Sequence, residues 1–278
     1  MKAKRRGVIL VIVLLMLALA ATIAAQVASH TIRLTAQAAS SEREMRERWA
    51  IVSLRRTILQ NAASLLTSED PMQNQSRFLA KREDFIVLAG SRYQMILQDE
   101  SSKIPVSRVM QSFGPLESKQ FLRQFVRTGP ILQPVIPKSP TQWQEVVDTD
   151  RLPANLLGNT MKEVGRHLTL WSDGRINVMT ADLVVLDAVW QAQFKASIPE
   201  TFLAVREGTL GNNRENMWSN LGLSEKELAF ANSWFKTVSS CHSLWLSREV
   251  PGRDRTLTAL YVRRGEQGFS DEHFGIHP

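Results

Sequence analysis

The chain has 278 residues, and its 34 lysine and arginine residues against 27 aspartate and glutamate residues give a formal net charge of +7. Four of the cations, Lys2, Lys4, Arg5 and Arg6, lie at the N-terminus, and the remaining excess of about +3 does not indicate nucleic-acid binding. Cys241 is the single cysteine, which excludes an internal disulfide framework and a multi-cysteine zinc site, and we expect it to be a buried apolar side chain.

The first predicted element is a long helix that begins with an apolar run at residues 8–25. The run carries no charge and is about as long as a helix must be to cross the hydrocarbon core of a bilayer. Neither proline nor glycine occurs between Gly7 and Pro71, so we predict one helix over residues 8–68, with residues 8–29 in the membrane. At 1.5 Å per residue this helix is a rod of roughly 90 Å. A rod that starts in a membrane and ends in water is typical of a polymer subunit.

Three interpretations of the apolar run are open. A secretory signal peptide would be cut after a small residue such as Ala25. An uncleaved signal anchor would keep the run in the membrane, with the basic leader on the cytoplasmic side. The third interpretation starts from the isolated Gly7, because KRRG followed by an apolar run resembles the prepilin leader. In that family a peptidase cuts after the glycine on the cytoplasmic side, which would make Val8 the new N-terminus.

One position of the apolar run differs from most pilins and pseudopilins. These proteins carry a glutamate four residues beyond the new N-terminus, and here Ile12 stands in that place. A major pilin is therefore disfavoured. The sequence is similar in this respect to the K-type minor pseudopilins of type II secretion systems, which lack the glutamate and lie at the filament tip. Val8, Ile12, Leu15 and Leu19 mark the predicted membrane helix.

The second half of the predicted helix carries an apolar stripe at helical spacing. We expect this stripe to pack on the sheet of the same chain, with a coiled coil to a partner as the alternative. Pro71 ends the helix near the sequence SEDP. The members of the stripe are Ile51, Leu54, Ile58, Ala62 and Leu65.

Two hairpins are predicted after the helix. FIVLAG and SRYQMILQDE form the first around Gly90, and HSLWLSREV and TLTALYVRRG form the second near the C-terminus. Helices are predicted between them, including one that starts after Ser224, where Glu227 completes a capping box. The pair of helices joined near Pro199 has no glycine in its turn, so we do not expect a helix-hairpin-helix that binds DNA.

Two similar turns are the most distinctive motifs. DESSKIPV starts at Asp99, and SDGRINV contains the strong turn dipeptide Asp173-Gly174, in which glycine accepts a positive φ. We expect Asn177 to bond its own neighbouring backbone, and Thr180 to cap the helix that follows. This pattern favours turn and capping chemistry over a ligand-binding site.

Both turns are similar to segments of the K-type minor pseudopilins. That family has a strand that ends in an Asp-Glu turn, and later a Gly-Asp-Gly-like turn followed by Ile-Asn and Val-Asn-Thr-Ala. Asp99 and Glu100 match the first, and residues 173–181 match the second, with Met179 in place of an asparagine. The resemblance implies an α+β pseudopilin fold, in which a long N-terminal membrane-spanning helix packs on a small antiparallel sheet and an all-helical domain is inserted.

The resemblance also implies a division of the chain. The leader is expected at residues 1–7, the pseudopilin α/β core at 69–105, 169–180 and 239–265, the inserted helical domain at 106–168 and 181–238, and a loose tail at 266–278.

The function implied is that of a minor pseudopilin of a type II secretion system, at the pseudopilus tip, which takes part in protein export across the outer membrane. The expected partners are other minor and major pseudopilins, the prepilin peptidase and the bacterial inner membrane, with no nucleic acid. Expected features are N-terminal methylation and a single membrane pass, with the C-terminal body in the periplasm. The alternative is a signal-anchored periplasmic binding or interaction protein.

An enzyme is not expected, because the sequence has no Walker loop, nucleophile elbow or HExxH motif. The five histidines have no spacing that forms a ligand set. The resembled family binds calcium, and Asp148 and Asp150 have suitable oxygen ligands, but the dense spacing of an EF-hand loop is missing. We expect a solvated acidic turn there, with calcium binding as the open alternative; the sequence identifies no certain cofactor and leaves the metal site unknown.

Overall fold

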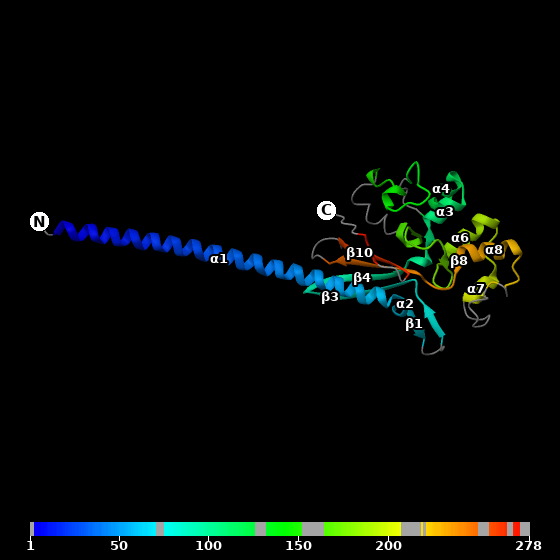
Figure 1. The fold of residues 1–278 in the computed structure, drawn as a ribbon, viewed down its shortest axis with the longest axis horizontal. Coiled ribbons are helices and arrows are strands. Elements are labelled where there is room, and N and C mark those ends of the chain that lie inside the picture. The colour runs from blue at the N-terminus through cyan, green and yellow to red at the C-terminus, as the bar shows by residue number, and fades with distance from the viewer. Residues whose placement is uncertain are drawn as a thin grey trace. The chain divides into compact units, whose positions relative to one another are not determined.

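The computed structural model describes residues 3–70, 75–125, 132–151, 164–206, 218, 221–249, 256–265 and 269–272. The chain divides into two compact units (Figure 1). The first unit comprises Met1–Leu54 with Leu88–Gly90, and the second comprises Arg55–Val87 with Ser91–Pro278.

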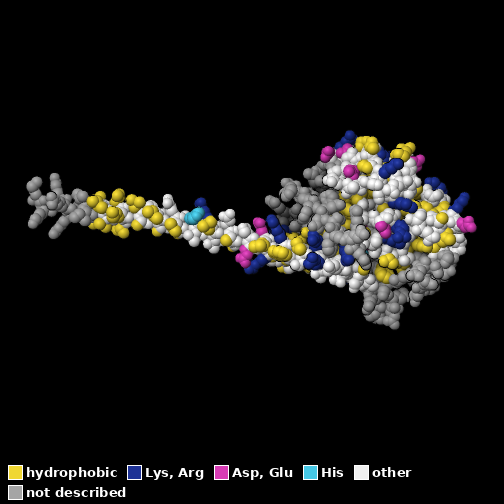
Figure 2. All heavy atoms as spheres, viewed as in Figure 1, with side chains coloured by type: hydrophobic (Ala, Val, Ile, Leu, Met, Phe, Trp, Pro, Cys, Tyr) yellow, Lys and Arg dark blue, Asp and Glu magenta, His cyan; other side chains and the backbone are white. Residues whose placement is uncertain are grey.

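Helix α1 runs without a break from Ala3 to Gln60, so the predicted long helix is confirmed, and it begins before the predicted first residue, Val8. Its apolar N-terminal part is exposed, as the hydrophobic side chains in Figure 2 show. An 18-residue window of this helix has a mean hydropathy of 2.6 and none of it is buried in the protein. Exposed apolar surface of this extent is unfavourable in water. Among the described residues, α1 is the one helix with the length and composition to cross a membrane.

The helix ends earlier than the predicted residue 68. Helix α1 ends at Gln60, directly before Asn61. The side-chain amide of Asn61 donates to the carbonyl of Thr57 at 2.9 Å and so competes with the backbone hydrogen bonds of the helix. The short α2 (Ala62–Leu65) follows. The next residues form β1 (Thr67–Asp70), which pairs antiparallel with β2 (Gln75–Phe78).

The last residues of α1, from Arg55 to Gln60, belong to the second unit and pack on strand β10 (Thr256–Arg264). Leu59 is completely buried, and its carbonyl accepts a hydrogen bond from Arg263 at 2.8 Å. The guanidinium carbon of Arg55 lies 5.1 Å from the centre of the Tyr261 ring, within the range of a cation–π contact. Of the predicted stripe, Ala62 is buried in this unit. Leu59 and Arg55 are not members of the stripe, so the expectation that the stripe covers the sheet of the same chain stays a prediction.

Five strands form the main sheet, in the order β11-β10-β9-β4-β3, and pairing is antiparallel from β4 through β11. Both predicted hairpins contribute to it, with Gly90 at a positive φ of 84° in the first turn. The strands are β3 (Lys81–Leu88), β4 (Ser91–Asp99), β9 (Cys241–Arg248), β10 (Thr256–Arg264) and β11 (Phe269–Glu272).

The prediction of a loose tail at 266–278 is wrong for Phe269–Glu272. These residues pair with β10 in register, from Arg263 opposite Phe269 to Leu260 opposite Glu272. The reason is that β10 would otherwise leave one row of backbone hydrogen-bonding groups without a partner strand. The rest of the tail lies outside the described residues.

Two very short parallel sheets and a set of helices complete the second unit. The sheets join β5 (Ile104–Pro105) to β6 (Leu168–Thr169), and β7 (Ile176–Asn177) to β8 (Phe235–Lys236). The helices are α3 (Val106–Ser112), α4 (Pro115–Arg123), α6 (Leu183–Phe194), α7 (Glu200–Arg206) and α8 (Glu225–Trp234). The 3-10 turns are η1 (Glu100–Ser102), η2 (Trp143–Glu145) and η3 (Thr149–Arg151).

The hydrophobic core of the second unit joins these helices to the sheet. It includes Cys241 and Leu260 from the strands and Trp190 from α6, so the expectation of a buried cysteine is confirmed. Trp190 lies 4.7 Å from Phe194 and 5.7 Å from Phe202 between ring centres. The α+β fold class is as predicted. The division into a pseudopilin core and an inserted helical domain stays a prediction, because one core runs through both.

Candidate functional site

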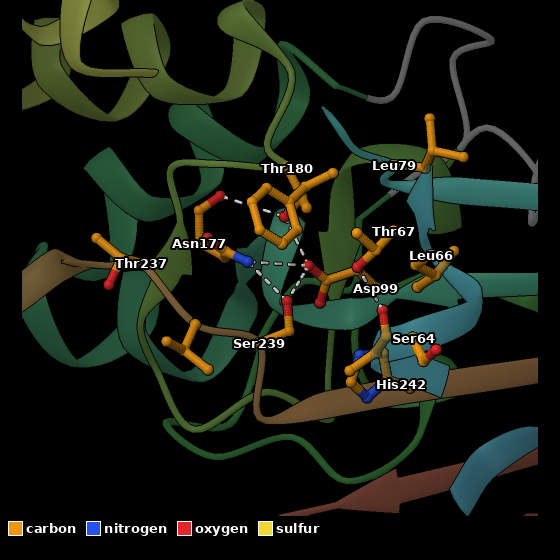
Figure 3. A pocket seen from close by; sticks show the side chains of 13 residues that line it. Ser64, Leu66, Thr67, Leu79, Asp99, Asn177, Thr180, Thr237, Ser239 and His242 are labelled. Atoms are coloured by element: carbon orange, nitrogen blue, oxygen red, sulfur yellow. Dashed lines mark hydrogen bonds between the residues drawn. The ribbon is translucent and has the colours of Figure 1, made fainter. Parts of the chain in front are cut away.

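The two turns that the sequence singled out lie together at the end of β4 (Figure 3). Asp99 is the last residue of β4, and none of its surface is exposed. One carboxylate oxygen, Oδ1, accepts a hydrogen bond from the backbone N–H of Ser101 at 2.8 Å. The other, Oδ2, accepts from the Thr180 hydroxyl at 2.6 Å and from the Asn177 amide at 3.3 Å. Asp99 therefore connects the first turn to the second, although Asn177 and Thr180 lie 78 and 81 residues beyond it in sequence.

A third segment joins them from the loop after β8. The Ser239 hydroxyl donates to Oδ2 of Asp99 and accepts a hydrogen bond from the Asn177 amide at 2.6 Å. The neighbouring Ser240 N–H donates to the Ser101 hydroxyl at 3.1 Å. We call Asp99, Asn177, Thr180 and Ser239 the Asp99 cluster. It holds three separate parts of the chain through one buried carboxylate.

The second turn confirms one expectation and corrects another. Asn177 does bond its neighbouring backbone, since its Oδ1 accepts from the Met179 N–H at 3.0 Å. Thr180 does not cap the next helix. The N-cap of α6 is Asp182, whose carboxylate accepts from the Val184 N–H at 3.2 Å. The Thr180 hydroxyl bonds Asp99 instead, and hydrogen bonds to an ionised acceptor are the stronger kind.

Beside this cluster lies a buried ion pair. The side chain of Glu100 is fully buried, that of Lys103 is 5 % exposed, and their charged atoms are 2.7 Å apart. Lys103 also donates to the side chain of Gln98 at 2.5 Å, and the Ser243 hydroxyl donates to the same Glu100 oxygen at 2.5 Å. The second oxygen of Glu100, Oε2, is buried and has no hydrogen-bond partner among the described residues.

The Asp173-Gly174 turn is confirmed, with Gly174 at a φ of 90°. Oδ1 of Asp173 accepts from the Arg175 N–H at 3.1 Å and from Lys236 at 2.9 Å. Partial burial raises the pKa of Asp173, but the hydrogen bond and charge of Lys236, together with the Arg175 N–H, outweigh it. The pKa of Asp173 is therefore below its ordinary value.

Replacing Lys236 by glutamine is expected to raise the pKa of Asp173, because burial then acts with less opposition. In the wild type, the lowered pKa contributes stability that is present above the pKa of the unfolded chain and is lost as pH falls through the folded value. The variant should lose less stability than the wild type between about pH 5 and pH 3. Carboxyl-carbon NMR titration measures the pKa, and thermal unfolding across this pH range measures the stability. An unchanged pKa in the variant would contradict the assigned cause.

A cavity of about 250 Å³ lies next to the Asp99 cluster. His242 lines it and stands opposite Asp99 in the β4–β9 register. Ser239, Ser101 and His242 were not predicted as site residues, since no spacing or motif marks them. Their role is visible only once the sheet brings β9 and the loop after β8 beside the end of β4.

The remaining predicted site residues lie elsewhere. Gly7 and Val8 are in α1, but their side chains are outside the described part. Ile12, Leu15 and Leu19 are 49 %, 62 % and 55 % exposed, as the apolar half of α1 requires for contact with lipid or other helices. None of these residues belongs to the cluster.

The acidic residues proposed for calcium do not form a ligand group. Asp148 pairs with Arg151 at 3.1 Å, which supplies the opposite charge a cation would otherwise provide. Within the described residues, no group of three or more histidine, cysteine, aspartate or glutamate side chains is placed to hold a metal ion.

Comparisons with known proteins find similarity in the fold and not in the sequence. No family profile matches the sequence, and no curated protein matches it. The fold is similar to a chain in the crystal structure of the GspK-GspI-GspJ complex from the type 2 secretion system of enterotoxigenic Escherichia coli. The match has 15 % sequence identity and a TM-score of 0.45, and it covers 85 % of this chain and 98 % of that chain.

Proposed function

We propose that this chain is a minor pseudopilin of a type II secretion system, similar to the K type, which acts at the pseudopilus tip and takes part in protein export across the outer membrane. The observation that carries the proposal is α1. A basic leader, an isolated Gly7 and an exposed apolar window lie in one unbroken helix of 58 residues that continues into a body with an antiparallel sheet. The motifs of the body, Asp99-Glu100 and residues 173–181, are the second support.

The mechanism we propose is mechanical. The prepilin peptidase cuts after Gly7, the apolar part of α1 stays in the inner membrane, and the body lies in the periplasm. On assembly, α1 leaves the bilayer and packs its apolar surface among the helices of other minor and major pseudopilins. Its exposed leucine and isoleucine side chains suit both environments, because each removes them from water. Such a role needs no catalytic residue and no cofactor.

Ile12 supports a position at the tip. The free amino group of a subunit entering a helical bundle is a cation in a low-dielectric surround, and an unpaired charge there is costly. A glutamate four residues beyond the cleavage site would pair with the amino group of a neighbour. With Ile12 in that position, this chain offers no such carboxylate to the next subunit. It can therefore enter the filament once, at an end, where its own amino group pairs with a glutamate of a subunit beside or below it.

The Asp99 cluster suits a body that must stay rigid while the filament pushes on it. Buried hydrogen bonds to a carboxylate hold the end of β4, the turn before α6 and the loop after β8 in one arrangement. A cap on a filament works only if the body keeps its shape under load.

N-terminal sequencing tests the proposal. We expect the chain expressed in membranes with a prepilin peptidase to begin at Val8, and a Gly7→Val variant to keep its leader. Ala25→Val is the matched control, because it blocks a signal-peptidase cut after residue 25 and leaves the start at Val8 unchanged. A start at Gln26 that Ala25→Val abolishes would show a cleaved signal peptide. An intact leader in all three proteins would support the signal-anchored periplasmic protein.

A further inference from the structure

The cavity beside the Asp99 cluster is not explained by the proposed function. It lies among α2, the β1–β2 pair and the loop after β8, and Figure 3 shows the side chains that surround it. Its volume of about 250 Å³ is below the roughly 300–1,000 Å³ typical of pockets for drug-sized ligands. The space therefore suits a small fragment or a single side chain.

The cavity is lined by a negative charge and by no positive one. The residues that line it include no lysine and no arginine. The hydrogen bonds that Asp99 accepts within the described part of the chain come from neutral groups: two hydroxyls, an amide and a backbone N–H. Nearby Lys236 is bound to Asp173, and Arg263 donates to the Leu59 carbonyl. An opposite charge within about 4–6 Å favours the ionised form of a carboxylate, so a cation in the cavity would be attracted by Asp99.

His242 is a second polar group at the cavity. Its side chain is 8 % exposed and lines the cavity. Burial lowers the pKa of His242, and Arg263 and Lys236 lower it further against the opposing charges of Asp99 and Glu100. The net pKa is below the ordinary value, which favours the neutral ring, and a neutral imidazole has one nitrogen that accepts hydrogen bonds.

The other walls suit a short alkyl chain. Leu66, Leu79 and Val238 line the cavity, and Val238 is 67 % exposed at its rim. Ser64 and Ser239 add hydroxyl oxygens that accept hydrogen bonds. Acceptors, a nearby carboxylate and an apolar wall together match a cationic head on an apolar stem.

We propose that this cavity binds a primary alkylammonium group, either of a free small amine or of a lysine side chain from a partner segment. The N–H groups are donated to His242 and Ser239, the charge is balanced by Asp99 behind Ser239, and the alkyl chain lies against Leu66 and Leu79. An alcohol of the same length lacks the charge, and a carboxylate of the same length is repelled by Asp99.

The experiment uses the full chain in detergent micelles with ¹³C-labelled histidine. The chain has five histidines, so the spectrum is simple, and a His242→Gln variant assigns the signal. Titration with n-butylammonium is expected to shift the His242 signal and to lower its pKa, because a cation then lies beside the ring. Butan-1-ol and butyrate should bind at least about tenfold more weakly. Equal binding of butan-1-ol, or no response of His242 to n-butylammonium, would overturn the proposal.

Two further arms complete the test. Ser64→Leu changes an exposed lining residue and should weaken n-butylammonium binding by about tenfold or more without changing the melting temperature, whereas Ser233→Leu on the exposed face of α8 should do neither. Unchanged affinity in Ser64→Leu would place the amine elsewhere and overturn the proposal. The peptide N-acetyl-Ala-Lys-Ala-amide, in which the lysine side chain is the one ammonium, distinguishes the two sources. Tighter binding of the peptide than of n-butylammonium identifies a lysine side chain, and the reverse order identifies a free amine. The relative affinity of the peptide and n-butylammonium does not depend on cleavage after Gly7, so this test is separate from the test of the proposed function.

Discussion

Replacing Asp99 by alanine is expected to lower the free energy of unfolding by about 4 kcal/mol, the upper range for a single substitution. The carboxylate is fully buried and accepts four hydrogen bonds from three separate segments. Alanine would leave the donors of Thr180, Asn177, Ser239 and the Ser101 backbone facing a void. A buried donor without an acceptor costs about 1–3 kcal/mol, although neighbouring losses do not add fully.

Urea unfolding of the full chain in micelles, followed by tryptophan fluorescence, measures this loss. Asp99→Asn separates charge from shape, because an amide of nearly the same size keeps one acceptor and turns the other into a donor. We expect it to lose about half as much stability as Asp99→Ala. Asp150→Ala is the matched control, since Asp150 is exposed, and it should change the stability by less than about 0.5 kcal/mol. A loss from Asp99→Ala as small as that of the control would show that the cluster does not hold the fold.

Local patterns in the sequence were sufficient for much of the fold. The unbroken helix α1 follows from a long stretch without helix breakers, and the strands of both hairpins follow from apolar runs separated by turn residues. The capping box of α8 is confirmed as well, with Ser224 and Glu227 bonding each other's backbone N–H groups. Each of these features depends on residues that are close in sequence, where spacing reports geometry directly.

The Asp99 cluster could be predicted only in part. Both of its turns were singled out, and a local bond of Asn177 was predicted correctly. Thr180 was assigned to a helix cap because Ser and Thr commonly cap, but its hydroxyl meets a carboxylate 81 residues away. Nothing around Ser239 marks it in the sequence, since a pair of serines in a loop has no period. Strand β11 could not be predicted for a related reason. The sequence FSDE has no strong strand pattern, and its pairing with β10 depends on the rest of the sheet.

Replacing Lys103 by methionine is expected to lower the free energy of unfolding by about 3 kcal/mol. Methionine replaces most of the volume of the lysine stem, so the loss comes mainly from leaving the fully buried Glu100 without its cation. Breaking one partner of a buried ion pair typically costs about 3–5 kcal/mol. The lower end is expected here because Ser243 still donates to Glu100 at 2.5 Å.

The matched control is the surface change Lys81→Met. It breaks an ion pair with Glu83 in which the two side chains are 49 % and 40 % exposed, and it should cost less than about 1 kcal/mol.

A double-mutant cycle shows which part of that loss is due to the unpaired charge. Glu100→Gln alone leaves Lys103 buried beside Gln98 with no anion, so it should also destabilise. The double variant Lys103→Met with Glu100→Gln has no buried charge at this position, and we expect it to recover most of the stability lost in either single variant. Urea unfolding of the four proteins gives the coupling energy.

If the double variant instead loses the sum of the two single losses, the two side chains act independently, and the 2.7 Å contact between them contributes no coupling. Full recovery would mean that the pair adds little net stability. Oε2 of Glu100 has no hydrogen-bond partner among the described residues of the wild type, so the pair is already imperfectly satisfied, and this geometry favours recovery of most of the loss.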